Sequence, residues 1–234
     1  MATVLRVNEI KTIWPFNATA AIFDFDGTIA DSLDVWKRVD DIFFERRGIA
    51  YKQNYAETLS VLGFEEGAQY TIKTYGLNET VDEICAEWNE LGRTLYKTEV
   101  ELRPYALEYI KAIKQKGAAV GLATTNRPYV LEAVKPRIDL DRLFEARVYG
   151  CEVSRPTKQD PDIYLECAQR LNRAPQNCVV FEDIATGLRS AKKAGMTTVG
   201  VLTDPRHQNA QTLFEAADYV IESWEIFKST LGLH

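Results

Sequence analysis

The sequence predicts an α/β fold in which a doubly wound parallel sheet carries helices on both faces and holds an inserted, purely helical domain. Three observations predict it. After Arg103, short apolar runs alternate with amphipathic helical stretches, which is the pattern of strand–helix–strand units. Between residues 30 and 102 such apolar runs are scarce and helical spacing dominates. Polar clusters follow three of the apolar runs, at the strand ends where open α/β sheets bind ligands.

The inserted domain is predicted to span residues 30–102, which leaves residues 1–29 and 103–234 as the core domain. No proline lies between Pro15 and Pro104. The insertion holds 15 acidic and 8 basic residues, whereas the rest of the chain is nearly neutral. We interpret this acidity as a solvated helical surface. The predicted helices are 32–47, 56–62, 65–75 and 79–96, with Ser32 as an N-cap and Gly48 and Gly76 as helix stops.

The core domain starts with the apolar stretch Ala21–Phe23, which predicts a buried strand. Strands and helices then alternate, and this alternation favours a parallel sheet. Further strands are predicted at 118–123, 146–149, 178–181, 197–201 and 219–221, and helices at 104–116, 129–134, 161–171 and 185–194.

Composition excludes several classes of function. The chain has only two histidines, His207 and His234, so histidine triads and multi-histidine metal sites are close to excluded. Any metal site is therefore expected to be oxygen-rich, which favours Mg²⁺ over Zn²⁺. The formal net charge of −6 disfavours nucleic acid as a partner.

Cysteine usage and the N-terminus bear on the compartment. The four cysteines form no Cys-x-x-Cys pair, and we expect a reduced, cytoplasmic protein with small buried thiols. Residues 1–17 contain no long apolar run, so neither a secretory signal nor a membrane span is expected there. This segment is predicted to be a short strand or an added arm.

Two carboxylates, Asp24 and Asp26, stand two positions apart directly after the first predicted strand. Neighbouring acids repel, and a cation or a shared proton is the usual way to hold them together. The alternative is a solvated Asp-Gly turn. The polar pairs Thr125-Asn126 and Glu182-Asp183 also follow predicted strands. The three clusters are therefore expected at one edge of the sheet.

Four motifs in this order resemble the haloacid dehalogenase superfamily of phosphatases and phosphotransferases. They are Asp-Phe-Asp-Gly-Thr at 24–28, Thr125-Asn126 after a strand, Lys158, and Glu182-Asp183 followed by Gly187. The resemblance covers nearly the whole chain except residues 1–16. A helical insertion directly after the first motif is similar to the cap of the subclass that includes phosphoglycolate phosphatases and β-phosphoglucomutases.

The resemblance implies a role for each motif residue. Asp24 would attack phosphorus and form an aspartyl phosphate, and Asp26 would act as general acid and base. Lys158 would pair with Asp24 and the phosphoryl group, and Thr125 and Asn126 would donate hydrogen bonds to phosphoryl oxygens. Mg²⁺ would be held by the Asp24 side chain, the Asp26 main-chain carbonyl and Asp183, with Glu182 binding directly or through water.

Each of these residues also has a plain structural interpretation. Thr125 could be only a helix N-cap, Lys158 a solvated lysine, and Glu182-Asp183 an acidic turn before a helix. The resemblance is also incomplete, because Lys158 is flanked by Thr157 and Gln159 where the subclass more often has Gly-Lys-Pro.

The predicted function is Mg²⁺-dependent hydrolysis of a small phosphorylated metabolite. A phosphoglucomutase-type phosphotransferase ranks lower, because Trp36 stands where the β-phosphoglucomutases carry a histidine ten residues after Asp26. A phosphonate hydrolase would use a Schiff base on a cap lysine, and Lys37, Lys52 and Lys73 are the candidates. A non-catalytic binding module with the same fold is the alternative from another class. No motif specifies the substrate or the oligomeric state.

Overall fold

The computed structural model describes residues 2–5, 14, 16–59, 62–155, 157–202, 204 and 208–232. The two histidines, His207 and His234, and most of the N-terminal segment lie outside the described residues. The chain forms two compact units. Unit 1 comprises Met1–Asp31, Glu101–Asn126 and Ile138–His234, and unit 2 comprises Ser32–Val100 and Arg127–Arg137.

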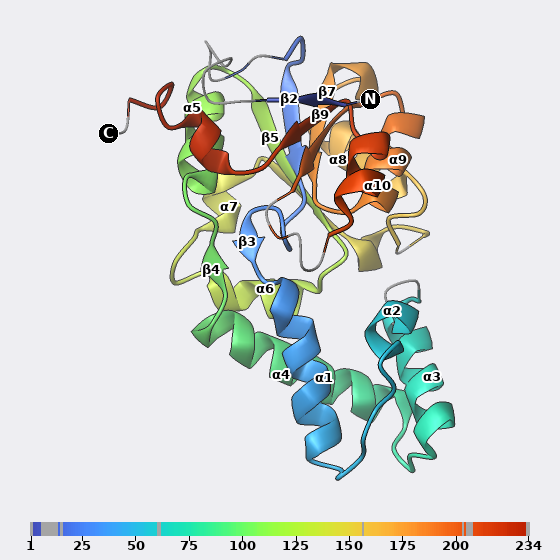
Figure 1. Cartoon of the computed structure of the whole chain (residues 1–234). Coiled ribbons are helices and arrows are strands. Elements are labelled where there is room, and N and C mark those ends of the chain that lie inside the picture. Colours follow the sequence, from blue (N-terminus) through green and yellow to red (C-terminus); the bar gives the residue numbers. More distant parts are fainter. Residues whose placement is uncertain are drawn as a thin grey trace. The chain divides into compact units, whose positions relative to one another are not determined.

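Unit 1 is built on a parallel sheet, as the sequence predicts (Figure 1). Every strand pair described in this sheet is parallel. Within the described residues its strand order is β1-β9-β8-β7-β2-β5-β6. The strands are β1 (Thr3–Val4), β2 (Ala20–Phe23), β5 (Ala119–Thr124), β6 (Ala146–Tyr149), β7 (Cys178–Glu182), β8 (Thr197–Val201) and β9 (Tyr219–Ile221).

Side chains that alternate along the central strands build two cores, one on each face of the sheet. Ile22 and Val180 pack among buried residues of helix α8 (Asp162–Arg170), such as Ile163. On the opposite face, the rings of Phe23 and Phe181 stack with centroids 4.8 Å apart. The aromatic group there continues through Tyr109 of helix α5 (Ala106–Gln115) and through Trp224 and Phe227.

Helices lie on both sides of the sheet, with α5 on one side and α8, α9 and α10 on the other (Figure 1). The α/β fold class predicted from the sequence is confirmed. The other helical elements of unit 1 are α7 (Leu140–Leu143), α9 (Ala185–Lys193), α10 (Ala210–Ala216), and the 3₁₀ turns Gly150–Glu152, Pro175–Asn177 and Trp224–Phe227. A small antiparallel pair, β3 (Ala30–Asp31) with β4 (Glu101–Leu102), stands where the chain enters and leaves the segment Ser32–Val100 of unit 2.

Unit 2 is entirely helical within the part that the structure describes. Its helices bury an aromatic core that includes Phe43, Phe44 and Trp88. Residues 127–137, which the predicted boundaries leave in the core domain, belong to this unit. Its elements are α1 (Leu33–Glu45), α2 (Tyr55–Leu59), α3 (Phe64–Tyr75), α4 (Val81–Thr98), α6 (Pro128–Leu131) and the 3₁₀ turn Glu132–Val134.

Several local expectations need correction. Ser32 stands at the N-cap of α1, but its side chain makes no capping hydrogen bond. The cysteines are not all buried thiols: Cys167 and Cys178 are buried, Cys85 is half-buried and Cys151 is exposed. Helix α10 was not predicted, although the Asn209 side chain caps its start by accepting from Thr212 N. One short helix offers too little periodicity to stand out in the sequence. No helix in the described ranges has the length and apolar character needed to cross a membrane.

Candidate active site

The first motif is held in the middle of the sheet of unit 1. Strand β2 lies between β7 and β5, and Phe23 is in register with both Phe181 and Leu122. The main-chain N–H of Asp24 continues the ladder by donating to the Phe181 carbonyl at 3.0 Å. Because the three strands are parallel, their carboxyl ends meet at one edge of the sheet. The residues that follow them are thereby brought together, as the sequence predicts.

A buried ion cluster forms at this edge. Lys158 Nζ donates to Asp24 Oδ1 and, at 2.8 Å, to Glu182 Oε2. The exposed fractions of the three side chains are 6% for Lys158, 2% for Asp24 and 0% for Glu182. Lys158 is therefore not the solvated lysine of the plain structural interpretation, but a buried cation paired with two acids.

The acids of this cluster exceed its cations. One carboxylate oxygen from each of Asp24, Glu182 and Asp183 lies within 4.8 Å of the others, and all three residues are buried. Burial raises the pKa of Asp24 well above its ordinary value, Glu182 raises it further, and Lys158 opposes them. Burial also raises the pKa of Asp183 well above its ordinary value, and the neighbouring carboxylates of Glu182 and Asp24 raise it further. Repulsion among buried carboxylates is the condition that a divalent cation relieves.

Two further observations show that these residues fit a metal ion. Asp24 Oδ2 is buried and has no hydrogen-bond partner within the described part of the chain. Burial would lower the pKa of Lys158, but Asp24, Glu182 and Asp183 outweigh this effect and raise it. The lysine therefore stays charged and leaves an excess of negative charge. An all-oxygen donor set of this kind suits Mg²⁺.

Glu182 accepts hydrogen bonds on both of its oxygens. Oε2 accepts from Lys158 and, at 2.7 Å, from the Tyr164 hydroxyl, whereas Oε1 accepts from the main-chain N–H groups of Asp183 and Ile184, each at 3.2 Å. Tyr164 was not predicted from the sequence. Its only signal there is a tyrosine on the buried face of the predicted helix 161–171, where it looks like ordinary core.

Asp26 accepts a hydrogen bond from a side chain that follows β5. Its Oδ2 accepts from Asn126 Nδ2 at 2.9 Å, and the main-chain N–H of Asn126 donates to Thr124 Oγ1 at 3.1 Å. Asn126 thus connects the end of β5 to the second carboxylate of the first motif. Thr125 is exposed beside it and is not a helix N-cap, because α6 begins at Pro128 with Arg127 in the N-cap position.

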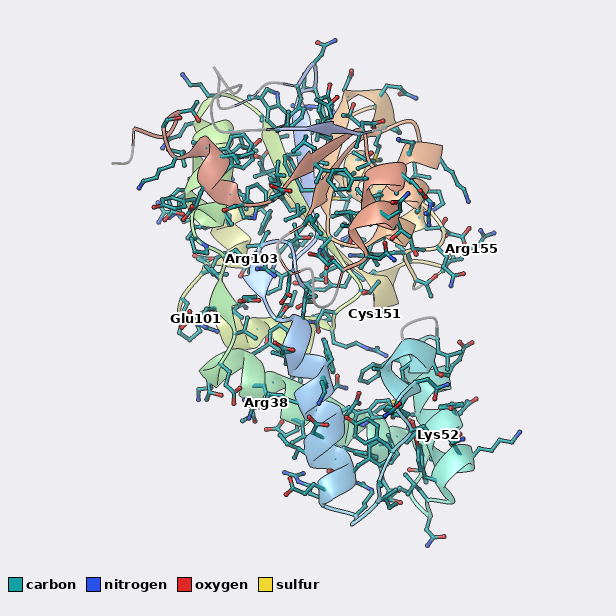
Figure 2. The ribbon with its side chains drawn as sticks, viewed as in Figure 1. Arg38, Lys52, Glu101, Arg103, Cys151 and Arg155 are labelled. Carbon is teal, nitrogen blue, oxygen red and sulfur yellow. The ribbon has the colours of Figure 1, made fainter. Side chains whose placement is uncertain are left out.

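The loop after Asp26 is held by side chains from distant parts of unit 1. Gly27 adopts φ +76°, a left-handed conformation that favours glycine, and its carbonyl accepts from Arg103 Nε at 2.8 Å. The Thr28 carbonyl accepts from Trp224 Nε1 at 2.9 Å. Arg103, labelled in Figure 2, stands directly after β4. Neither donor was predicted from the sequence, because neither belongs to a motif.

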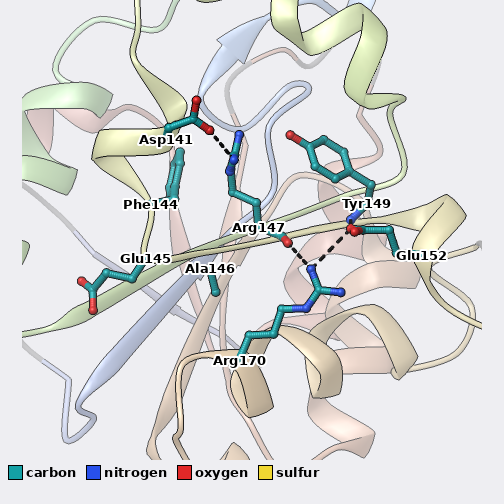
Figure 3. Close-up of a pocket in the computed structure, with 8 residues that line it drawn as sticks. All are labelled: Asp141, Phe144, Glu145, Ala146, Arg147, Tyr149, Glu152 and Arg170. Carbon is teal, nitrogen blue, oxygen red and sulfur yellow. Dashed lines mark hydrogen bonds and ion pairs between the residues drawn. The ribbon is translucent and has the colours of Figure 1, made fainter.

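A cavity of about 410 Å³ lies elsewhere on unit 1, along the edge strand β6 (Figure 3). Arg147 forms an ion pair with Asp141, and Arg170 Nη1 donates to the Arg147 carbonyl at 2.6 Å (Figure 3). None of the predicted site residues lines this cavity, so it is a feature separate from the ion cluster. Its lining is Asp141, Phe144, Glu145, Ala146, Arg147, Tyr149, Glu152 and Arg170.

Comparison with known proteins agrees with this site. A model of the haloacid dehalogenase-like hydrolase family matches residues 18–195, a range that contains Asp24, Lys158 and Asp183. A phosphorylated carbohydrates phosphatase of Thermotoga maritima is 28% identical over 181 residues, covering 77% of this chain and 83% of that protein. Hexitol phosphatase B of Escherichia coli is 29% identical over 215 residues, covering 89% of this chain and 94% of that protein.

A solved structure shows the same likeness in three dimensions. The crystal structure of CbbY from Rhodobacter sphaeroides in complex with phosphate superimposes with a TM-score of 0.77 at 25% sequence identity. The match covers 92% of this chain and 100% of that one. The resemblance inferred from the four motifs and the prediction of an enzyme of this class are therefore confirmed. The chain belongs to the haloacid dehalogenase-like hydrolase family.

Proposed function

We propose that this protein is a Mg²⁺-dependent phosphatase that hydrolyses a small phosphomonoester through an aspartyl phosphate on Asp24. The observation that carries the proposal is the state of that carboxylate. One oxygen of Asp24 is held by Lys158, and the other, Oδ2, is buried without a hydrogen-bond partner in the described residues. A buried oxygen in that state is costly unless a ligand or a reacting atom meets it.

The reaction is proposed to proceed in two displacements. In the first, a carboxylate oxygen of Asp24 attacks phosphorus, the bond to the alcohol oxygen breaks, and Asp26 gives that oxygen its proton. In the second, Asp26 takes a proton from water, the water oxygen attacks phosphorus, and Asp24 leaves with its electron pair. The contact between Asn126 and Asp26 supports this role, because it holds the proton carrier in one orientation.

Three side chains of this protein would hold the phosphoryl group. Lys158 supplies a fixed cation beside Asp24. Thr125 and Asn126, which follow β5 at the same sheet edge, would donate hydrogen bonds to the phosphoryl oxygens. Mg²⁺ would be held by the side chains of Asp24 and Asp183 and the main-chain carbonyl of Asp26, with Glu182 binding directly or through water. When bound, it would offset the repulsion between the carboxylates and the phosphoryl oxygens.

The names of the relatives guide the choice of substrate. Those proteins act on phosphorylated carbohydrates and hexitol phosphates, as their names state. We therefore propose phosphorylated sugars and polyols as the first substrates to test. Residues 30–102 are proposed to act as a cap that excludes bulk water while the aspartyl phosphate forms.

The environment of unit 2 weakens two alternatives. The Trp36 ring packs against the rings of Phe64 and Tyr96, at centroid distances of 6.3 and 6.4 Å, which supports a core role rather than that of a mutase histidine. Schiff-base chemistry needs a desolvated lysine. The three candidate lysines, Lys37, Lys52 and Lys73, are exposed.

A phosphomonoester panel with Mg²⁺ tests the proposal. We expect release of inorganic phosphate, its loss on chelation and its recovery when Mg²⁺ is restored. Mg²⁺ should also raise the thermal midpoint of the wild type, because a ligand that binds only the folded state stabilises that state. The increase should be much smaller for Asp183→Asn, which lacks one of the proposed metal ligands. Isomerised hexose phosphate in place of free phosphate would favour the mutase. No turnover across the panel would favour the binding module.

A further inference from the structure

Tyr164 lies fully buried beneath the ion cluster, although nothing in the proposed reaction uses it. Its hydroxyl donates to Glu182 Oε2 at 2.7 Å, and the same oxygen accepts from Lys158 Nζ at 2.8 Å. Lys158 in turn donates to Asp24. A continuous chain of hydrogen bonds therefore runs from helix α8, through the end of β7, to the carboxylate that follows β2.

The position of the Glu182 carboxylate is determined from both sides. Two main-chain N–H groups at the start of the turn after β7 hold Oε1, and the Tyr164 hydroxyl and the Lys158 ammonium share Oε2. Four donors match the acceptor capacity of one ionised carboxylate. Without the hydroxyl, Oε2 would have only Lys158 to fix it, and the carboxylate would be held less tightly on the side that faces the lysine.

Helix α9 confines this contact at close range. A Cβ atom at Gly187 would lie 2.6 Å from Tyr164 Oη and 2.8 Å from Glu182 Cδ, which is closer than real Cβ contacts. The Tyr164 hydroxyl and the Glu182 carboxylate therefore lie in close contact with the main chain of α9 at Gly187. The family motif ends on this glycine, and the structure gives a physical reason for a residue without a side chain there.

We propose that Tyr164 is a positioning residue of the active site: by fixing Glu182, it holds the Lys158 ammonium against Asp24. This inference rests on the proposed function, because it assigns Tyr164 to the same reaction. It also assigns Glu182 to the lysine rather than mainly to the metal ion. The Tyr164 hydroxyl does not reach the reacting atoms, so its effect must pass through the glutamate.

The test compares two tyrosine variants that remove a buried hydroxyl from the same unit. Tyr164→Phe removes the donor to Glu182. Tyr109→Phe is the matched control, because Tyr109 is also fully buried and its hydroxyl has no hydrogen-bond partner among the described residues. With p-nitrophenyl phosphate and Mg²⁺, Tyr164→Phe should lower kcat about 10-fold, which corresponds to about 1.4 kcal/mol, just below the range for a hydrogen bond to a charged group.

The distribution of the loss separates positioning from general damage. For Tyr164→Phe, the Mg²⁺ concentration that gives half-maximal activity should stay within about twofold of wild type, because Asp24 and Asp183 are intact. Tyr109→Phe should leave kcat unchanged. In a Glu182→Gln background, adding Tyr164→Phe should change kcat by less than about twofold, since a residue that acts through Glu182 has no effect once that carboxylate is gone.

Three results would overturn the inference. They are equal kcat for Tyr164→Phe and Tyr109→Phe, a loss that appears only as a higher Mg²⁺ requirement, and a full 10-fold effect of Tyr164→Phe in the Glu182→Gln background. Crystal structures of the two single variants provide a readout that needs no activity. Tyr164→Phe should displace Lys158 Nζ from Asp24 or Glu182, and Tyr109→Phe should not. An inactive wild-type protein would contradict the proposed function. The comparison of the two variant structures would still test whether Tyr164 positions Lys158.

Discussion

Two ion-pair clusters in this protein have similar composition and very different surroundings. In unit 1, Lys158 pairs with Asp24 and Glu182, and none of the three side chains is more than 6% exposed. In unit 2, Arg47 pairs with Glu79 at 2.7 Å and Glu87 at 2.6 Å, and these side chains are 16–34% exposed. Each cluster centres on one cation paired with two carboxylates, but Asp183 adds a third acid in unit 1 and Arg46 adds a second cation in unit 2. The two clusters therefore differ both in burial and in the balance of charge.

The acids respond in opposite directions. Burial would raise the pKa of Glu87, but Arg47 and Arg46 outweigh it and lower the pKa. At Asp24, burial and Glu182 outweigh Lys158, and the pKa stays well above its ordinary value. The unit 2 cluster therefore favours the charged, folded state. The unit 1 cluster keeps an unfavourable arrangement of charge, which is the arrangement expected of a site that serves a ligand rather than stability.

Asp24→Asn should separate function from stability most clearly. The variant keeps the shape of the side chain but removes the proposed nucleophile, and we expect phosphatase activity to fall by at least about 10³-fold. Its thermal midpoint without metal should equal or exceed that of the wild type, because one of three clustered acids is gone. Activity assays and thermal unfolding of the same preparation check both parts. An active variant, or one that is inactive because it is unfolded, would contradict the comparison.

Lys158→Met should show how much the buried cation contributes to stability. Its removal leaves Asp24, Glu182 and Asp183 buried together without a counter-charge, and this should lower the free energy of unfolding by about 3–5 kcal/mol. Urea unfolding at pH 7 and at pH 4 measures the effect, which should shrink at pH 4 as the acids take up protons. A loss below about 1 kcal/mol would mean that solvent reaches the cluster.

Asp40→Asn extends the comparison to a buried acid in unit 2. Burial, and then the neighbouring Asp41, raise the pKa of Asp40 from 3.8 to about 7, against the opposing charge of Lys37. The folded state therefore binds this proton more tightly than the unfolded state. The resulting stability is fully present below pH 3.8 and is lost as the pH rises to about 7.

We expect Asp40→Asn to gain roughly 2–4 kcal/mol relative to the wild type between pH 4 and pH 8. Urea unfolding of both proteins across this range measures the difference. Asp24 and Asp183 also titrate with raised pKa values, but they are present in both proteins and cancel. Parallel stability curves for the two proteins would show that Asp40 is well solvated and would remove this prediction.

Arg47→Met should have the smallest effect. The variant breaks the pairs with Glu79 and Glu87, but their carboxylates can turn to water, and we expect a loss of about 1 kcal/mol. Part of that loss reflects the Arg47 guanidinium stacked 3.6 Å above the centre of the Phe43 ring. The effect should shrink in 0.5 M salt, whereas that of Lys158→Met should not. Equal losses in the free energy of unfolding for Arg47→Met and Lys158→Met would contradict the proposed difference between the two clusters.

Sequence patterns predicted the elements that carry the site almost residue by residue. The strands that precede the site residues, β2, β5 and β7, were predicted to within one residue at each end, and β6, β8 and β9 were predicted with the bounds that the structure has. Asp24, Lys158, Glu182 and Asp183 were expected together, and they form one cluster. The carboxyl ends of parallel strands lie at one edge of the sheet, so a polar residue that directly follows a buried strand also lies at that edge. Local periodicity is enough for that inference.

Other features depended on the fold as a whole. Lys158 and Asp24 stand 134 positions apart, and the motif order predicted their pairing only through resemblance. Nothing local to Tyr164, Arg103 or Trp224 shows that each donates to the residues around the active site. Residues 127–137 carry an ordinary helical pattern, which does not reveal that they join unit 2.

The sequence by itself therefore determined the fold class, the family and the carboxylates at the sheet edge. These follow from periodicity and from residue types at the ends of strands, both of which are local properties of the chain. Only the tertiary structure decided which side chains hold those carboxylates in place. A tyrosine hydroxyl on a buried helix face reaches its partner at the end of β7 because α8 packs on β5, β6 and β2. Packing between segments that are distant in the chain cannot be recognised from a local sequence pattern.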